Sequence, residues 1–506
     1  MTEKYVENNK EIEVMVCKNT NLNKEGATVK NLIGYEWKDA SNSAVIEVVN
    51  PATQELIDTV PNVTDEDVDT AVKVAVEEQK KWEKVSIYDR ADILYKFVDL
   101  VEENKERLAV LLSNETGKPI KEARGEIGNT RSFVYGYVEK AKHEYGNVIP
   151  AGTEKGQEKT IQMTFQEPLG VVGCIIPFNF PCDLFGQKVP SALIMGNSVI
   201  VKPSTYNPLT LHTYCNLLME AGVPAGVINC ISGDGPTTGE YLAKHPMVNL
   251  MTVTGSTAVG SEVMGNCAKN ITHVMLELGG NDAFIVMNDA DMDLVIDEMV
   301  WGRLYNTGQV CCASKRFLVQ KDVKDEFIRR AVEKIKTLKV AMPQQEDADI
   351  GCLINEKAAI RVQDQIKKTL EQGAKLVYGG RRNGAFLEPT VLDNVTRDMD
   401  VMKDMEIFGP VIPVCSFDTV EEAIEIANQS SYGLCGNIMT RDMKTAFKVA
   451  NALEVGGAVI NGASFFRAAE MPFGGWKHSG IGNEGISTTL KEMSRTKTIV
   501  LKNILD

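Results

Sequence analysis

Residues 170–202 of the chain read GVVGCIIPFNFPCDLFGQKVPSALIMGNSVIVK. Two short apolar runs in this stretch and two that follow it have the composition of buried strands, and they lie at 171–176, 199–202, 227–231 and 250–253. Helical patterns at 211–221 and 238–244 lie between the later runs. Buried strands that alternate with helices are typical of a parallel sheet covered on both faces. The stretch therefore predicts a doubly wound α/β sheet.

A second α/β unit is predicted after Gly280, because the same alternation resumes there. Its strands are expected at 283–286, 317–320, 411–417 and 458–461. Ahead of the first unit, Thr64 and Asp67 have the spacing of a capping box that opens an amphipathic helix. Strict alternation of apolar and polar residues over 160–166 predicts a half-exposed strand.

Length and composition narrow the choice of fold and partner. A chain of 506 residues is too long for one simple core, so two or three lobes are expected. Hydrophobic residues make up 43% and charged residues 24%, as in ordinary globular proteins. The net charge of −15 argues against nucleic acid as a partner, because phosphate binding needs clustered Lys and Arg.

Several classes of segment and site are not expected from the sequence. Residues 1–31 mix Lys, Glu and Asn without an apolar run, which predicts a flexible extension and no secretory signal. The longest apolar stretches, such as 170–178, are shorter than the roughly 20 residues that cross a bilayer, so no membrane partner is expected. Eleven scattered cysteines indicate reduced thiols and a cytoplasmic protein. The five dispersed histidines predict no metal site.

Three motifs each contain a residue with chemistry of its own: NTGQVCCAS at 306–314, LELGGN at 276–281 and PFNFP at 177–181. The thiol of Cys311 can act as a nucleophile. The carboxylate of Glu277, which stands in a buried-strand context, can act as a base. The amide of Asn179 can stabilise an oxyanion. Together these groups are what the oxidation of an aldehyde through a thioester requires.

The order and spacing of these motifs, from about residue 32 to about residue 503, resemble the aldehyde dehydrogenase superfamily. The resemblance implies that Cys311 attacks the aldehyde, that Asn179 stabilises the oxyanion, and that Glu277 activates the water that releases a carboxylic acid. Relatives that pass the acyl group to coenzyme A typically lack this Glu, so the acid-forming branch is favoured. Residues 280–284 also resemble succinate-semialdehyde dehydrogenases.

The resemblance further implies NAD or NADP as cofactor. Residues expected to contact it are Ile176, Pro177, Lys202, Ser204, Thr205, Gly235, Thr254, Gly255, Ser256, Leu278, Glu406 and Phe408. Gly255 and Ser256 open a helix whose N-terminal amides can meet a pyrophosphate. NAD-preferring relatives often carry Glu at the position of Thr205, where a carboxylate repels a 2′-phosphate. Its absence here favours NADP.

Substrate contacts are expected from Phe180, Leu184, Gln187, Phe465, Phe466, Arg467 and Phe473. Arg467 could hold an anionic tail by a bidentate contact, or it could be a solvated surface residue. Gln187 and Tyr305 stand where succinate-semialdehyde relatives carry Arg, which weakens that assignment without excluding it. The expected substrate is a small aldehyde that is polar or anionic.

The family's architecture implies three parts for this chain. They are a Rossmann-like dinucleotide-binding domain over 1–149 and 169–277, an α/β catalytic domain over 278–482, and a small β oligomerisation arm over 150–168 and 483–506. The arm predicts a homotetramer or homodimer. Three alternatives stay open at this point: a coenzyme A-acylating aldehyde dehydrogenase, a thiol hydrolase without a redox step, and a non-catalytic structural relative.

Overall fold

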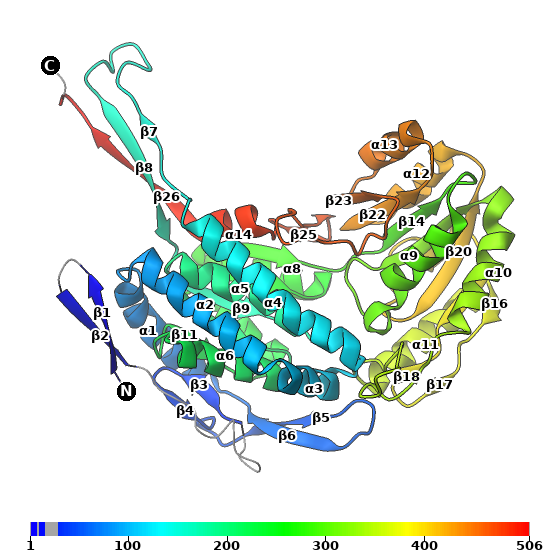
Figure 1. Cartoon of the computed structure of the whole chain (residues 1–506), viewed down its shortest axis with the longest axis horizontal. Coiled ribbons are helices and arrows are strands. Elements are labelled where there is room, and N and C mark those ends of the chain that lie inside the picture. Colours follow the sequence, from blue (N-terminus) through cyan, green and yellow to red (C-terminus); the bar gives the residue numbers. More distant parts are fainter. Residues whose placement is uncertain (1, 8–9, 16–28, 505–506) are drawn as a thin grey trace.

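The computed structural model describes residues 2–7, 10–15 and 29–504. Two α/β lobes lie side by side, and a narrow β arm projects from the first of them (Figure 1). The predicted fold class is therefore confirmed: the chain has two α/β units with mainly parallel sheets and a separate small sheet. No helix within the described ranges is both long and apolar enough to cross a membrane.

The first lobe is built on an eight-stranded sheet. Its strands, in spatial order, are β25 (Gly480–Ile481), β13 (His273–Glu277), β12 (Leu250–Thr254), β9 (Val171–Ile175), β10 (Ser198–Lys202), β11 (Ile228–Cys230), β3 (Asn31–Ile33) and β4 (Glu36–Lys38). The five central strands run parallel. In β10, Val199 and Val201 enter one hydrophobic core, and Ile200 enters the core on the opposite face. This is the doubly wound arrangement that residues 170–202 predict.

Helices cover both faces of this sheet. They are α1 (Asp65–Trp82), α2 (Ile87–Glu103), α3 (Lys105–Thr116), α4 (Ile120–Ala141), α5 (Pro181–Ile194), α6 (Leu209–Ala221), α7 (Glu240–Lys244), α8 (Thr257–Cys267) and α14 (Ile486–Glu492). Thr64 caps α1, and its side chain and that of Asp67 exchange the reciprocal hydrogen bonds of a capping box. The α7 segment is preceded by one π-helical turn at Gly235–Gly239.

The second lobe has a seven-stranded sheet. Its strands, in spatial order, are β16 (Lys375–Tyr378), β19 (Thr390–Val395), β20 (Val411–Phe417), β15 (Ser314–Gln320), β14 (Asp282–Val286), β22 (Cys435–Met439) and β23 (Gly457–Ile460). Only the edge strand β16 runs antiparallel to its neighbour. Its helices are α9 (Met292–Leu304), α10 (Lys324–Ile335), α11 (Glu356–Glu371), α12 (Val420–Asn428) and α13 (Met443–Ala452).

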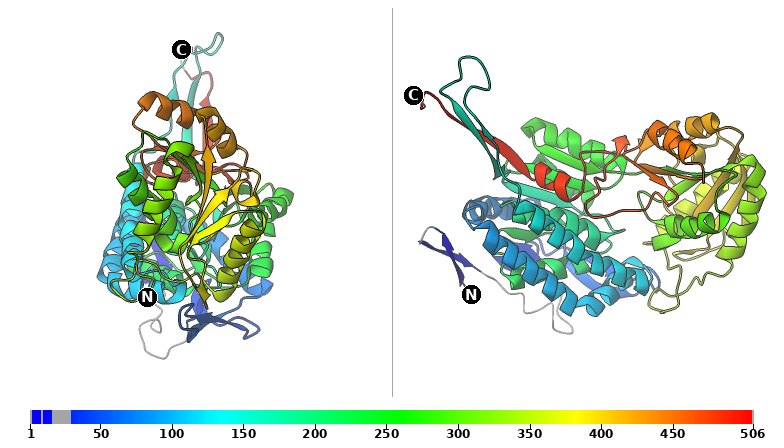
Figure 2. Two further views of the ribbon diagram at one scale, coloured as in Figure 1. Left: turned by 90° about the vertical axis from the view of Figure 1, so that its right-hand side faces the viewer. Right: turned by 45° about the horizontal axis from the view of Figure 1, so that its top comes forward.

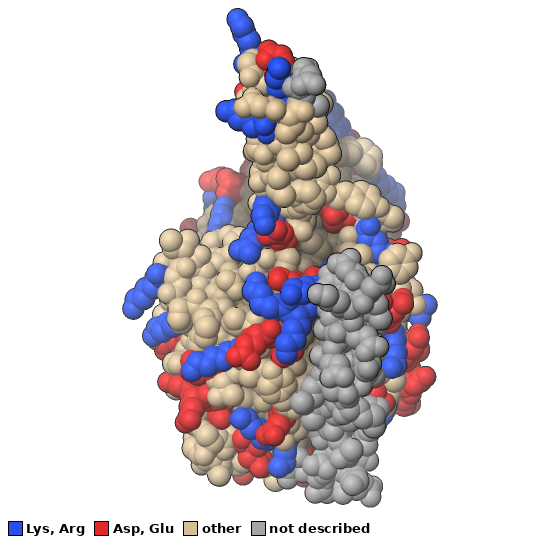
Figure 3. Space-filling model, turned by 90° about the vertical axis from the view of Figure 1, so that its left-hand side faces the viewer, with Lys and Arg blue, Asp and Glu red and all other residues tan. Residues whose placement is uncertain are grey.

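The arm is a three-stranded antiparallel sheet of β26 (Ser494–Leu501), β8 (Ile161–Pro168) and β7 (Val148–Ile149). The half-exposed strand predicted over 160–166 is its central strand. The arm extends away from both lobes (Figure 2), and on the face seen in Figure 3 its charged side chains lie near the tip and at the base, with an uncharged stretch between them. Before reaching the arm, the chain returns to the first sheet, where Gly480 pairs with Glu277. That crossing comes two residues before the predicted domain boundary at 482.

Short two-stranded pairings complete the fold: β1 (Thr2–Glu7) with β2 (Lys10–Met15), β5 (Val45–Val49) with β6 (Leu56–Pro61), β17 (Arg382–Asn383) with β18 (Phe386–Leu387), and β21 (Tyr432–Gly433) with β24 (Trp476–Lys477). The first of these lies in the part of the chain for which the sequence predicts a flexible extension. Residues 16–28 of that extension lie outside the described residues.

Candidate active site

The loop that carries Cys311 has an unusual backbone. It follows α9 through a short 3₁₀ turn in which Asn306, Thr307 and Gly308 have φ of 49°, 55° and 77°. Left-handed backbone is easy for Gly and tolerable for Asn, but it is strained for a β-branched residue such as Thr307. Such residues cost about 1–3 kcal/mol each and persist where neighbours hold them in place.

Two adjacent cysteines on this loop have opposite properties. Cys311 is half-buried, whereas Cys312 is buried. The pKa of Cys311 is lowered, first because the Cys312 thiol hydrogen-bonds to it, while burial opposes the shift and the positive charges of Lys315 and Arg467 support it. The pKa of Cys312 is raised well above its usual range by the same hydrogen bond and by burial. Cys311 is thus the partner that favours the thiolate.

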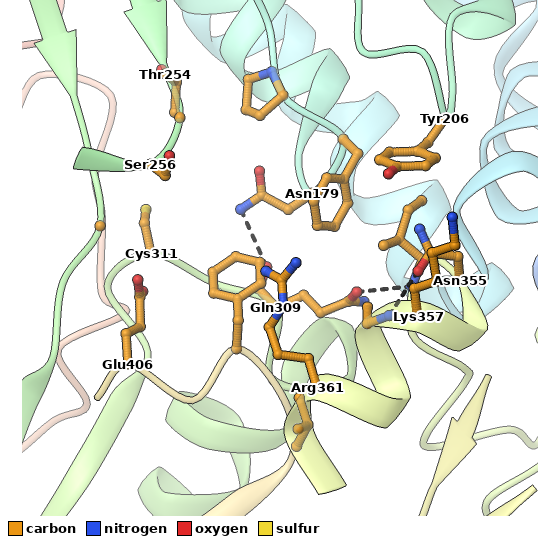
Figure 4. Close-up of a pocket in the computed structure, with 18 of the residues that line it drawn as sticks. Asn179, Tyr206, Thr254, Ser256, Gln309, Cys311, Asn355, Lys357, Arg361 and Glu406 are labelled. Atoms are coloured by element: carbon orange, nitrogen blue, oxygen red, sulfur yellow. Dashed lines mark hydrogen bonds between the residues drawn. The ribbon is translucent and has the colours of Figure 1, made fainter. Parts of the chain in front are cut away.

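Lys315 lies beneath the same loop. Its ammonium group, which is almost fully buried, donates to the Cys311 carbonyl oxygen at 2.5 Å and pairs with Glu406 at 3.0 Å. Glu406 faces the cavity that also contains Cys311 (Figure 4). The predicted nucleophile and a predicted cofactor-binding carboxylate are therefore joined through one buried cation.

Asn179 lies in the loop between β9 and α5 and is buried. Its side-chain amide donates to the carbonyl oxygen of Gln309 at 3.2 Å, and this contact brings it to the Cys311 loop (Figure 4). Asn179 and Cys311 line one cavity although they come from different lobes. An amide N–H in this position can reach an oxygen that develops charge next to the thiol.

Glu277 ends β13 and is buried. Its Oε2 atom has no hydrogen-bond partner among the described residues. Burial raises its pKa well above the usual range, and the nearby Glu484 carboxylate adds to the shift. A buried carboxyl group with a raised pKa and a free oxygen has the properties of a general base that is stronger than an exposed Glu.

Arg467 is part of a buried network of charges. It donates to Gln187 and, at 3.0 Å, to Glu484, and its guanidinium lies 4.1 Å from the centre of the Phe473 ring. Glu484 also pairs with buried Lys188, and the two cations lower its pKa, against the effect of burial. Two cations therefore share one carboxylate that is ionised. The surface position weighed for Arg467 in the sequence does not occur.

An aromatic wall lies next to Cys311. Phe180 stacks on Tyr305 at a ring-centre distance of 6.0 Å and lies at the same distance from Phe465, which also contacts Trp301 at 5.0 Å. Phe180, Phe465 and Phe473 belong to or pack on the small hydrophobic cluster that includes Cys312. Two of the predicted substrate residues are placed elsewhere: Phe466 is 49% exposed, and Leu184 is buried in the core of the first lobe.

A cavity of about 350 Å³ opens between the lobes beside Cys311. Six of the predicted cofactor residues line it: Pro177, Thr254, Gly255, Ser256, Glu406 and Phe408. Ser256 caps α8, so the first amides of that helix lie at the cavity edge. The cavity is also lined by Tyr206 and by the cations Lys357 and Arg361, which none of the sequence motifs includes (Figure 4). The one available signal was the spacing of the two cations, four residues apart on α11.

The remaining predicted cofactor residues are Ile176, Lys202, Ser204, Thr205, Gly235 and Leu278, and they do not line this cavity. Lys202 ends β10 and is buried, and burial lowers its pKa to about 8. Within the described part of the chain it forms no ion pair, and its one hydrogen bond, to the Pro203 carbonyl, is 3.4 Å long. The buried Thr254 hydroxyl likewise has no described partner. Polar groups left open in this way, beside a helix N-terminus, fit a dinucleotide.

Comparisons with known proteins agree with this geometry. The aldehyde dehydrogenase family is matched over residues 37–499. A mitochondrial succinate-semialdehyde dehydrogenase of Oryza sativa subsp. japonica is 37% identical over 94% of this chain and 90% of its own length. A 3-sulfolactaldehyde dehydrogenase of Priestia aryabhattai is 38% identical over 82% of this chain and 87% of its own length. The crystal structure of an E. coli NADP dependent enzyme superposes with a TM-score of 0.91 at 34% identity, covering 94% of this chain and 98% of that one.

The family match spans nearly the whole chain and includes every segment that forms the site. The chain belongs to the aldehyde dehydrogenase family, whose members oxidise aldehydes with NAD or NADP.

Proposed function

We propose that this enzyme oxidises a small aldehyde with an anionic group to the corresponding carboxylic acid, and that it uses NADP in preference to NAD. The reaction assignment rests on one observation: a thiol with a lowered pKa, an amide and an unpartnered buried carboxyl group meet where the two lobes join. Thiol, amide and carboxyl are the three groups that thioester-forming oxidation of an aldehyde needs.

In the first half of the reaction, the Cys311 thiolate attacks the aldehyde carbon and forms a thiohemiacetal. The Asn179 side-chain amide and the Cys311 backbone N–H donate to the oxygen that becomes negative. Lys315 keeps the loop in place through the Cys311 carbonyl and adds positive charge next to the thiolate. When bound, the nicotinamide ring supplies the acceptor for the hydride that leaves the former aldehyde carbon.

In the second half, Glu277 takes a proton from a water molecule, whose oxygen attacks the thioester carbon. The carbon–sulfur bond breaks, the acid leaves, and Cys311 is restored as a thiolate. Because the pKa of Glu277 is raised by burial, the carboxylate holds the proton it takes more strongly than an exposed Glu would. The same Glu277 argues against transfer of the acyl group to coenzyme A, and the dinucleotide-fitting cleft argues against a thiol hydrolase.

The charges around Arg467 support an anionic substrate. Arg467 and Lys188 are two cations that share one ionised carboxylate, Glu484. These three side chains therefore carry an excess of one positive charge beside the aldehyde site. Succinate semialdehyde and 3-sulfolactaldehyde, on which the two relatives act by name, are both anionic aldehydes. A carboxylate or sulfonate would be attracted by this excess.

Initial rates of NADH and NADPH formation test the substrate class. Succinate semialdehyde should be compared with butanal, a neutral aldehyde with a chain of the same length. We expect Arg467→Met to raise the KM for the anionic aldehyde roughly 10- to 100-fold, about 1.4–2.7 kcal/mol, and to change the neutral one far less. Arg467→Lys keeps the charge and serves as the control. Equal losses for both aldehydes would assign Arg467 to structure and overturn the anionic assignment.

The cofactor preference has a separate test. Thr205 carries no carboxylate that would repel a 2′-phosphate, and Lys202 has a buried ammonium group without a described carboxylate partner. We expect Thr205→Glu to shift the ratio of kcat/KM toward NAD, because a carboxylate there repels the 2′-phosphate. An unchanged ratio would place cofactor selection at other residues, such as Lys357 and Arg361.

The finer arrangement of the chain is also part of the proposal. Residues 1–149 with 169–277 serve as the dinucleotide-binding domain, 278–482 as the catalytic domain, and 150–168 with 483–506 as the oligomerisation arm of a homodimer or homotetramer. Ten cysteines of the described ranges are free thiols, which supports a reducing compartment such as the cytoplasm.

A further inference from the structure

Three charged residues at the start of α4 are buried although none of them contacts the cavity beside Cys311. Lys118 precedes the helix, and Glu122 and Glu126 follow one turn apart on its buried face. The start of α4 lies at the side of the first lobe nearest the second (Figure 1). Buried ionisable groups are costly unless their partners repay the loss of water, so the question is what these groups hold.

Glu126 holds the loop that carries Asn179. One of its oxygens accepts the backbone N–H of Cys182 at 2.8 Å, at the first turn of α5. Its other oxygen pairs with Lys118. Lys118 in turn donates to the backbone carbonyl of Asn179 at 2.9 Å and lies 4.0 Å from the centre of the Phe180 ring. The predicted oxyanion amide is therefore fixed from both ends of its loop by one ion pair.

Glu122 holds the loop that carries Cys311. Its Oε2 accepts the backbone N–H of Asn306 at 2.8 Å, which is the first of the left-handed residues. The Asn306 side chain then donates to the Asn179 carbonyl oxygen at 2.9 Å, and Gln309 donates back to the Asn306 carbonyl at 3.1 Å. The Asn179 carbonyl thus receives one donor from Lys118, just before α4, and one from the nucleophile loop.

We propose that Lys118, Glu122 and Glu126 are positioning residues. They fix the distance between the Asn179 amide in one lobe and the Cys311 thiol in the other. One face of α4 contacts both loops, so the distance between thiol and amide depends on the position of this helix. The inference rests on the proposed roles of Cys311 and Asn179.

Backbone strain in the Cys311 loop explains why the loop needs the hydrogen bond to Glu122. Left-handed Asn306 and Thr307 return to ordinary backbone angles when their neighbours release them. Without the Glu122 carboxyl, the Asn306 N–H is buried and unpartnered, which favours that relaxation. Burial raises the pKa of Glu122 to about 8, so near neutral pH the group acts mainly as a neutral acceptor. Glutamine offers the same carbonyl acceptor and should replace it.

The experiment compares three variants of the full-length enzyme. Glu122→Ala removes the acceptor, Glu122→Gln retains it, and Glu115→Ala is the matched control. Glu115 is as deeply buried and accepts the N–H groups of Leu209 and Thr210 at 2.9 Å, but it holds α6 and neither catalytic loop. Readouts are kcat, KM, melting temperature and the rate at which iodoacetamide alkylates Cys311.

We expect Glu122→Ala to lower kcat roughly 10- to 100-fold, because a displacement of about 1 Å between reacting groups has effects of that size. The KM and the alkylation rate should change by less than about 3-fold, since alkylation does not need the Asn179 amide. Glu122→Gln should stay within about 3-fold of the parent kcat, and Glu115→Ala should lower only the melting temperature.

Equal kcat losses for Glu122→Ala and Glu115→Ala, or a failure of Gln to restore kcat, would overturn the inference. If Glu122→Ala does not fold, Asn306→Asp tests the next hydrogen bond between the two loops, because it replaces the side-chain donor to the Asn179 carbonyl by an acceptor and should lower kcat similarly. The proposed function fails separately: retained turnover in Cys311→Ala would remove the nucleophile itself.

Discussion

Cys311 and Cys312 are adjacent, but their pKa values shift in opposite directions because the Cys312 thiol donates a hydrogen bond to Cys311. We expect Cys311→Ala to abolish turnover and Cys312→Ala to retain it. Removing the Cys312 donor raises the pKa of Cys311, so the thiolate forms at higher pH. The pH profile of Cys311 alkylation should therefore move upward in Cys312→Ala. Turnover that survives Cys311→Ala would move the nucleophile to Cys312.

Glu277 makes a second prediction at the residue scale. With Glu277→Gln, we expect a rapid burst of reduced cofactor equal to the number of sites, followed by a steady rate at least about 100-fold below the parent. The thioester forms without a base but is hydrolysed only slowly. In the parent enzyme, the raised pKa keeps Glu277 protonated until the pH exceeds the usual range for Glu, so thioester hydrolysis should speed up as the pH rises.

Stopped-flow absorbance at the reduced-cofactor band separates the two phases. The matching conservative change is Glu277→Asp, which keeps the carboxylate but shortens its reach and should restore part of the steady rate. A Glu277→Gln enzyme whose steady rate and pH profile equal those of the parent would assign the base to another group, such as Glu484.

At the scale of elements, the backbone conformation of the Cys311 loop requires a glycine at position 308. Its φ is 77°, and a Cβ atom there would lie 2.5 Å from the carbonyl of Gly409. Gly152 in the arm has the same φ, but a Cβ there would meet nothing within 4 Å. We expect Gly152→Ala to lower the free energy of unfolding by about 1–2 kcal/mol and to leave kcat unchanged. Gly308→Ala should lower the free energy of unfolding further and should also lower kcat. Thermal melting and kcat check the pair, and equal effects would refute the steric argument.

Sequence patterns predicted the elements better than the contacts between them. The strands β9, β10, β12 and β14 were visible because buried parallel strands are short apolar runs. The three chemical residues were visible because their motifs match a family. The hydrogen bond from Asn306 to Glu122 cannot be predicted in this way, because the two residues are 184 positions apart and no motif links them. Contacts of this kind depend on how two lobes pack, which periodicity does not encode.

The sequence also does not determine which of the predicted substrate residues face the pocket. Phe466 lies next to Phe465 in the sequence, and both were predicted to line the pocket, yet only Phe465 contacts Phe180 and Trp301. Adjacent residues in a loop point in different directions, and the sequence does not say which one faces inward. For Arg467, the sequence allows either a pocket or a surface position, and in the structure it is partly buried, in contact with Glu484 and Phe473.

At the scale of the whole molecule, the arm poses a problem for an isolated chain. The register of β8 and β26 puts Met163 opposite Ile499 and Ile161 opposite Leu501, so this part of one face of the arm is apolar. Phe165 lies on the same face, opposite Lys497, which pairs with Glu167. Phe165 and Ile499 are 43% and 39% exposed. The arm is a single sheet with no second layer of the same chain packed on it. Its apolar side chains gain stability only when another surface covers them. A second copy of the chain is the occupant that the proposed homo-oligomer supplies.

This arrangement yields a prediction with a built-in control. Ile499→Glu places a charge on the apolar face, whereas Thr498→Glu places the same charge one residue away on the opposite face, where Thr498 pairs with Thr164. We expect Ile499→Glu to sediment as a smaller species than the parent, and Thr498→Glu to keep the parent's size. Burying a charge at an interface costs several kcal/mol, enough to weaken association by at least about 100-fold. If both variants keep the parent's size, the apolar face of the arm is not the interface, and association must use the lobes instead.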